Sequence, residues 1–343
     1  MVIKIILFFI VFVLPYTFYS QSDSDVKPLY EVNVSKNLLG TVIEAKVIHE
    51  DINKAKSSLY LAFKEIERID SAYNLYHTGS PVYLINCNAG IKSRKIPYET
   101  FQLIKRATEY SKKYEQLFDI TIGPISDLWG FNSENEIQIP SKYILDSLLK
   151  LVDYRNIILN DKDTSVFLKN KRMMLDLGGI AKGFAVDRAS AIIKGLGINN
   201  FLINAGGDIC VHGKNRKNEP WAIGIKHPRK TDSLLASFNA TNTCIATSGD
   251  YERYIDIDGI RYHHILYPKT GMPGWKSRSV TVLFNTTEEA TVLAKYIFLI
   301  GYKKFERLSL SKEIKYFIVD NEGKISYSNS LLKENSIKIF EKK

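Results

Sequence analysis

The chain has 343 residues, a formal net charge of +10 and 45% hydrophobic residues. This composition excludes a chain that is disordered over long stretches, and the length allows a large buried core. The 47 Lys and Arg residues are spread along the sequence, without an RNA-recognition, helix-turn-helix or zinc-finger pattern. We therefore expect a folded protein with a solvated basic surface and no nucleic-acid partner.

The first 20 residues have the pattern of a signal peptide. Lys4 precedes an apolar run at 5–14, and Pro15 ends that run. An uncleaved anchor helix is the alternative, but the run is short for a membrane span. We expect cleavage after Ser20 and export to the periplasm or cell envelope. The sequence has no Cys near that point to carry a lipid anchor.

Hydrophobic periodicity predicts alternating and helical segments along the rest of the chain. In chain order they are a strand at 42–49, helices at 52–73, 100–114 and 141–151, strands at 154–159 and 164–168, a strand ending near 177, a helix from 183, strands at 201–204, 209–212, 221–226, 235–240, 244–247 and 278–284, a helix at 288–299, and a hairpin of 315–319 with 324–327. Strands and helices are mixed without βαβ regularity, which indicates an α+β fold with largely antiparallel sheets. No Pro/Ser-rich linker divides residues 21–343, so we expect one domain.

One segment, MLDLGGIAKGFAVDRA, concentrates chemistry at the start of a predicted helix. It contains Asp176, Gly178, Gly179, Lys182 and Gly183. Glycines allow a ligand to approach the backbone, and the first amides of a helix attract anions. A diphosphate would suit this place. The alternatives are a tight turn, a helix-capping Asp176 and a solvated lysine.

The three cysteines are Cys87, Cys210 and Cys244, and none has C-x-x-C spacing. An odd number in an exported chain leaves at least one thiol free, unless it pairs with another molecule. All three lie beside apolar segments, so we expect them to be small buried hydrophobic residues.

Four other segments, taken with the Gly-Gly-Ile-Ala-Lys-Gly run, resemble the motifs of a known family. They read FDITIGPISDLWGF, INAGGDICVHGK, IATSGDYERY and RYHHILYPKTGMPG. A further pattern of Ser71, Tyr73, Ser80 and Asn86 fits as well. In order and spacing, from about Leu39 to about 301, the chain resembles the ApbE family, the FAD:protein FMN transferases.

The resemblance implies a flavin site and a reaction. A hydroxyl of a Thr or Ser on a membrane-linked redox protein would attack FAD, take FMN and release AMP. His264 is the implied general base, although His263 beside it leaves the assignment open. The implied FAD-binding residues are Leu39, Tyr73, Trp129, Gly130, Phe131, Asp176, Lys182 and Leu266. For Tyr73 and the Trp-Gly-Phe run, core packing is the alternative.

The resemblance also implies magnesium as a cofactor, held at positions equivalent to Gly179, Thr291 and Lys295. Thr291 stands where the family has Asp, and Lys295 where it has Thr. A Thr/Lys pair lacks the oxygen ligands and negative charge that Mg²⁺ prefers. The Lys295 ammonium can instead take the place of the cation, and the alternative is that the metal site has decayed and Lys295 points to solvent. Tyr267 replaces a family Asp before Pro268.

Three functions remain open at this point. The first is the transferase, and the second is a non-catalytic exported FAD-binding or flavin-carrier protein of the same family, favoured by the changed residues. The third is an exported lectin-like or structural β protein, which accounts for the signal peptide but for none of the motifs.

Overall fold

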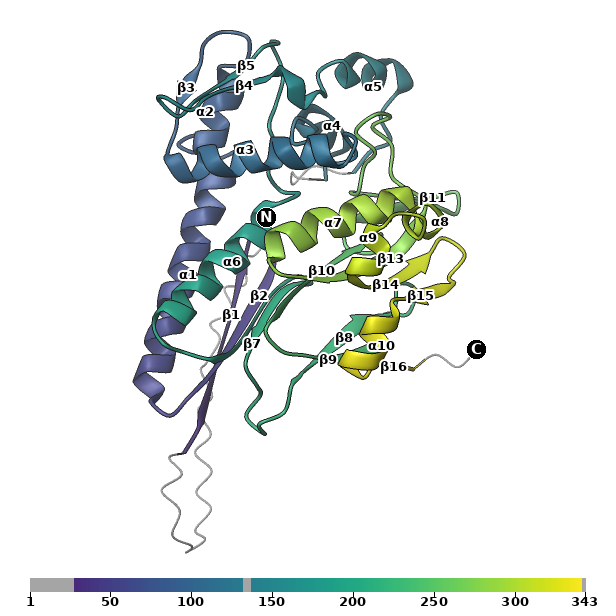
Figure 1. Cartoon of the computed structure of the whole chain (residues 1–343). Coiled ribbons are helices and arrows are strands. Elements are labelled where there is room, and N and C mark those ends of the chain that lie inside the picture. Colours follow the sequence, from purple (N-terminus) through teal and green to yellow (C-terminus); the bar gives the residue numbers. More distant parts are fainter. Residues whose placement is uncertain (1–27, 132–136, 341–343) are drawn as a thin grey trace, which may run out of the picture.

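A computed structural model describes residues 28–131 and 137–340. The predicted signal peptide at 1–20 lies outside these residues. The centre of the fold is an eight-stranded antiparallel sheet in the order β1-β2-β6-β7-β10-β13-β14-β15 (Figure 1). Its strands are β1 (Tyr30–Leu38), β2 (Thr41–His49), β6 (Asn200–Ala205), β7 (Asp208–His212), β10 (Thr243–Gly249), β13 (Ser277–Phe284), β14 (Lys315–Asp320) and β15 (Ile325–Tyr327).

Helices cover one face of this sheet, and a small second sheet covers the other. The helices are α1 (Ile52–Tyr73), α6 (Ala181–Gly195) and α7 (Thr287–Ile300). The second sheet has the order β16-β9-β8, and α10 lies beside it. Its elements are β8 (Trp221–Lys226), β9 (Leu234–Ala240), α10 (Asn329–Asn335) and β16 (Lys338–Ile339).

The central strands are buried on both faces because their side chains alternate between two cores. On β10, Cys244 and Ala246 belong to the helix-side core, whereas Ile245 packs against the second sheet. Successive side chains of a β-strand point to opposite faces of the sheet, so neighbouring residues of β10 enter different cores. β13 repeats the pattern with Val282 and Leu283.

The segment between α1 and α6 forms a smaller, mostly helical part above the sheet in Figure 1. It contains α2 (Pro81–Cys87), β3 (Arg94–Lys95), α3 (Tyr98–Lys113), α4 (Gly123–Trp129), α5 (Lys142–Leu149), a 3₁₀ turn at Tyr154–Asn156, β4 (Ile157–Asn160) and β5 (Ser165–Leu168). The remaining elements are the hairpin β11 (Tyr254–Ile257) and β12 (Ile260–His263) and the short helices α8 (Tyr302–Phe305) and α9 (Leu310–Glu313). Within the described residues, no helix has the length and apolar character needed to span a bilayer.

The α+β prediction is confirmed, and the predicted helix at 52–73 matches α1. The predicted strand ending near Leu177 is wrong. That segment makes only one isolated bridge, between Met174 and Ile122, and the Asp176 N–H donates to the carbonyl of Ile120. Cys87 is exposed at the end of α2, which corrects the expectation that it is buried.

Candidate active site

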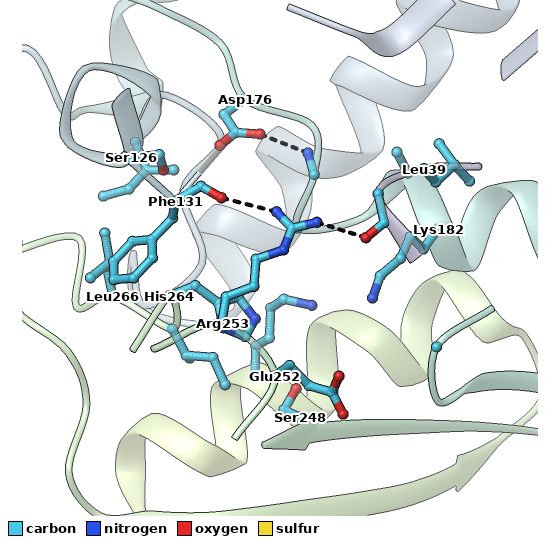
Figure 2. Close-up of a pocket in the computed structure, with 18 of the residues that line it drawn as sticks. Leu39, Ser126, Phe131, Asp176, Lys182, Ser248, Glu252, Arg253, His264 and Leu266 are labelled. Atoms are coloured by element: carbon cyan, nitrogen blue, oxygen red, sulfur yellow. Dashed lines mark hydrogen bonds between the residues drawn. The ribbon is translucent and has the colours of Figure 1, made fainter. Parts of the chain in front are cut away.

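A cavity of about 440 Å³ lies where the helical part meets the ends of strands β2, β7 and β10 of the main sheet. This volume falls within the range of small-molecule sites. Residues far apart in the sequence line it, including Leu39, Tyr73, Phe131, Asp176, Gly179, Lys182, Asp208, Arg253, His264, Leu266 and Lys295. Figure 2 shows several of these side chains converging on one space.

The turn before α6 places Asp176 in the cavity wall, and the first turn of α6 places Lys182 there. Asp176 Oδ1 accepts a 2.8 Å hydrogen bond from the Gly178 N–H, which stabilises the turn. Gly183 has a packing role instead of opening the backbone to a ligand. A Cβ there would lie 2.6 Å from the Thr287 carbonyl oxygen and 2.6 Å from Thr291 Oγ1. Glycine at 183 therefore allows α6 and α7 to touch.

Lys182, Asp208 and Lys295 form one cluster among the charged residues of the cavity, whose lining also includes Asp70, Asp119, Asp176, Glu252 and Arg253. Lys182 Nζ lies 3.9 Å from Asp208 Oδ2. Asp208 is buried, and this oxygen has no hydrogen-bond partner among the described residues. Lys295 extends from α7 into the same space, where burial lowers its pKa to about 8 although Asp208 opposes the shift. Lys182 and Lys295 offer two ammonium groups to an anionic ligand, while Asp208 and Asp176 offset part of the charge at Lys295.

The two histidines have different surroundings. His263 is buried, its Nε2 donates to the Gly274 carbonyl at 3.0 Å, and its Nδ1 accepts from the Ile265 N–H at 3.2 Å. Both of its ring nitrogens are therefore used structurally, and burial lowers its pKa to about 4.

His264 lines the cavity, and its Nδ1 is buried without a hydrogen-bond partner in the described part of the chain. Burial is the first cause that lowers the His264 pKa well below its usual value, followed by the charges of Lys182 and Lys295. The imidazole is therefore neutral at pH 7 and can accept a proton. An anion that neutralised the lysines would raise its pKa and make it a stronger base. These contacts favour His264 over His263 as the candidate base.

Arg253 lines the cavity and was not identified from the sequence. Its Nη1 donates to the Phe131 carbonyl and its Nη2 to the Gly40 carbonyl, each at 3.1 Å (Figure 2). These two partners lie 91 residues apart and belong to different parts of the fold. The guanidinium thereby connects the loop after α4 to the turn between β1 and β2.

The apolar wall contains Leu39, Tyr73, Phe131 and Leu266. Trp129 and Gly130 do not line the cavity. Trp129 is fully buried, its indole N–H donates to the Gly271 carbonyl at 2.8 Å, and its ring stacks on Phe131 with centroids 5.5 Å apart. Gly130 ends α4 in the left-handed conformation. Trp129 and Gly130 therefore support Phe131 from the side that faces away from the cavity.

The positions that the resemblance assigns to magnesium do not offer a magnesium site. Thr291 is buried, and its hydroxyl donates to the Thr287 carbonyl at 2.8 Å, so its oxygen is committed within α7. Lys295 supplies a cation where a ligand oxygen would be needed. Gly179 does line the cavity. Across 28–131 and 137–340, no group of three His, Cys, Asp or Glu side chains is arranged to hold a metal ion.

Tyr267 serves a structural purpose. Its hydroxyl donates to the Leu299 carbonyl near the end of α7, and its N–H donates to the Met272 carbonyl. Asp250, in the TSGDY segment, forms a bidentate pair with Arg229 at 2.7 and 2.6 Å. Both residues fix loops around the cavity instead of lining it.

Comparisons with known proteins agree with this arrangement. The model of the ApbE family matches residues 39–318. A relative from Klebsiella pneumoniae, named FAD:protein FMN transferase, is 32% identical over 271 residues, which cover 78% of this chain and 82% of that protein. The crystal structure of the ApbE protein of Thermotoga maritima has a TM-score of 0.81 and 32% identity, covering 88% of this chain and 98% of that one. The flavin transferase ApbE of Vibrio cholerae has a TM-score of 0.79 and 25% identity, covering 89% and 99%.

Proposed function

Because this chain belongs to the ApbE family, we propose that it is an FAD:protein FMN transferase. The observation that carries the proposal is one cavity that combines an apolar wall, two lysines and a neutral histidine with a free ring nitrogen. The apolar wall suits the flavin ring, and the lysines suit the diphosphate.

The reaction joins an acceptor Thr or Ser oxygen to the phosphorus next to riboflavin. The bond from that phosphorus to the bridging oxygen breaks, and AMP leaves with the electron pair. His264 takes the hydroxyl proton at its unpartnered Nδ1. Lys182 and Lys295 offset the negative charge of the diphosphate and of the departing AMP.

We further propose that FAD binding does not require magnesium. The support is the Thr291 hydroxyl engaged within its helix and the Lys295 ammonium at the cavity. An ammonium neutralises charge without the ligand geometry of a metal. EDTA should therefore leave the FAD affinity unchanged. A loss of FAD binding in EDTA that Mg²⁺ restores would refute this part.

The pattern at 1–20 supports a proposal for the location, and the family resemblance supports one for the acceptor. We propose export by the segment at 1–20, with cleavage after Ser20, and an acceptor that is an exported or membrane-linked redox protein. The cleaved and unprocessed forms can be separated by mass after cell fractionation. An intact N-terminus found in the cytoplasm would contradict export.

The transferase proposal is tested with the exported, purified protein, FAD and a candidate acceptor. In-gel flavin fluorescence should appear on the acceptor, with AMP released in equal amount. His264→Gln should slow transfer by about 100-fold or more, because it removes the base, and should still bind FAD. Absence of both products, where a relative that transfers FMN to the same acceptor succeeds, would refute the enzyme.

A flavin carrier is the second candidate function, because Thr291 and Lys295 replace the residues that the resemblance implies for magnesium binding. A flavin carrier would bind FAD through the same wall but release no AMP. In that case neither wild type nor His264→Gln would release AMP or label the acceptor. The comparison of these two proteins therefore separates the carrier from the transferase.

A further inference from the structure

Two of the three cysteines meet inside the main sheet. Cys210 on β7 and Cys244 on β10 are direct partners in the antiparallel register, and their Sγ atoms lie 3.2 Å apart. Both are buried, whereas Cys87 is exposed on α2. The partners are 34 positions apart in the sequence, so no local pattern indicated this pairing.

The position of the pair in the ladder suits a covalent bridge. If the pairing of β7 and β10 is continued along the strands, Thr247 lies opposite Gly207. The Thr247 N–H donates to the Gly207 carbonyl, so Thr247 and Gly207 are a hydrogen-bonded pair. Hydrogen-bonded and non-hydrogen-bonded pairs alternate, so Cys244 and Cys210 form a non-hydrogen-bonded pair. Such pairs have Cα atoms about 4.5 Å apart, within the range that a disulfide spans. A bridge therefore requires little movement of the backbone.

We propose that Cys210 and Cys244 form a cross-strand disulfide in the exported protein, leaving Cys87 as the free thiol. The oxidant is a disulfide compound, such as oxidised glutathione or an exported thiol oxidoreductase. The Cys210 thiolate attacks it and forms a mixed disulfide, releasing one thiol. The Cys244 thiolate then displaces the second thiol and closes the bridge. Two protein thiols are oxidised and one disulfide of the oxidant is reduced to two thiols.

Once β7 and β10 have paired, the hydrogen bond within the pair favours this order of attack. Cys244 donates to the Cys210 sulfur, and this bond lowers the pKa of Cys210. Because both sulfurs are buried in the folded protein, we expect the bridge to form during folding, before the helices cover it.

The bridge would lie directly beneath the candidate active site. β7 begins at Asp208 and β10 passes through Ser248, both of which line the cavity. Cys244 Sγ also lies 3.9 Å from Oδ1 of Asp187, the α6 carboxylate that accepts from the first amides of α7. A disulfide here ties together the strands that support the helices of both cavity lysines.

The decisive experiment maps the thiols. The reduced, unfolded chain is refolded in a glutathione redox buffer, and protein isolated from the cell envelope without reductant is treated in parallel. Each sample is then denatured with an alkylating reagent. We expect alkylation of Cys87 alone and a disulfide-linked peptide pair containing Cys210 and Cys244, with all three thiols alkylated after reduction. Three alkylated cysteines in both unreduced samples, or a bridge to Cys87, would overturn the proposal.

A stability measurement gives a second readout. Closing a loop of this length should raise the melting temperature of the oxidised protein by roughly 5 °C over the reduced protein. Cys87→Ser should keep the difference, and the double variant Cys210→Ala with Cys244→Val should abolish it. If the mapped bridge forms but the melting temperature does not rise, its stabilising role is wrong. Neither readout depends on FMN transfer, so failure here leaves the proposed function untouched.

Discussion

Lys295 is the residue whose charge most distinguishes this cavity. It faces Asp208 and Lys182, and burial makes its ammonium costly unless an anion is near. We expect Lys295→Met to weaken FAD binding by about 1–3 kcal/mol, the range for losing a charged hydrogen-bond partner. Fluorescence titration of FAD measures this. Lys303→Met, which removes a lysine at the exposed surface, is the matched control and should leave the affinity unchanged.

Equal affinities of wild type and Lys295→Met would show that the ammonium does not meet the diphosphate. The reverse pattern, tighter binding without the ammonium, would show that its cost of burial exceeds its attraction to FAD. In either case Lys182 would remain as the phosphate-binding candidate.

His263 should make the fold sensitive to acid. Its folded pKa of about 4 lies below the usual value because the buried ring stays neutral. Between these two pKa values the unfolded chain binds more protons, so the free energy of unfolding falls as the pH falls. From pH 7.5 to pH 5 this single group should cost about 2 kcal/mol. Urea unfolding at both pH values measures the loss.

The variant His263→Gln isolates that contribution from the carboxylates that titrate in the same window. Its amide can still donate to the Gly274 carbonyl but cannot take up a proton. It should be less stable than wild type at pH 7.5 and lose less stability on acidification. Identical losses in the two proteins would mean that His263 is protonated in the fold.

At the scale of elements, α6 and α7 form one unit. Asp187 of α6 accepts from the N–H groups of Thr287 and Glu288 at 2.8 and 2.9 Å and so caps α7 from a neighbouring helix. Asp187→Ala should lower the free energy of unfolding by about 2–3 kcal/mol, because two amides lose their acceptor. Asp187→Asn keeps an acceptor and should cost less. Similar losses for both variants would show that the charge, not the hydrogen bonding, matters.

Single elements were predictable from sequence because their information is local. The apolar spacing of α1 and the N-cap at Asp51 lie within one segment. The site is not local: Lys182 with Asp208, and Arg253 with Gly40 and Phe131, meet only after folding. The order of the sequence motifs identified Lys182 and His264 as candidate site residues. The spacing of apolar residues gives no indication of Asp208 or Arg253. The prediction of a strand ending near Leu177 was wrong because an apolar segment can be buried without pairing with a neighbouring strand.

At the scale of the whole molecule, the cavity joins the main sheet to the helical part between α1 and α6. Asp208 and Ser248 come from the sheet, whereas Ile122 and Phe131 come from the helical part. A ligand that contacts both should stabilise the molecule as one unit. At 100 times its Kd, FAD should raise the free energy of unfolding by about 2.7 kcal/mol and raise the melting temperature accordingly.

The conditions that weaken this stabilisation identify its physical origin. If lysine charges hold the diphosphate, the FAD-induced rise in melting temperature should shrink between low salt and 1 M NaCl, because the Debye length falls from about 30 Å at 0.01 M to about 3 Å. EDTA should leave the rise unchanged. AMP added instead of FAD should give a smaller rise, because it lacks the flavin for which we propose the apolar wall with Phe131 and Leu266. A rise that resists salt and disappears in EDTA would assign the charge neutralisation to a metal ion and return Lys295 to a structural role.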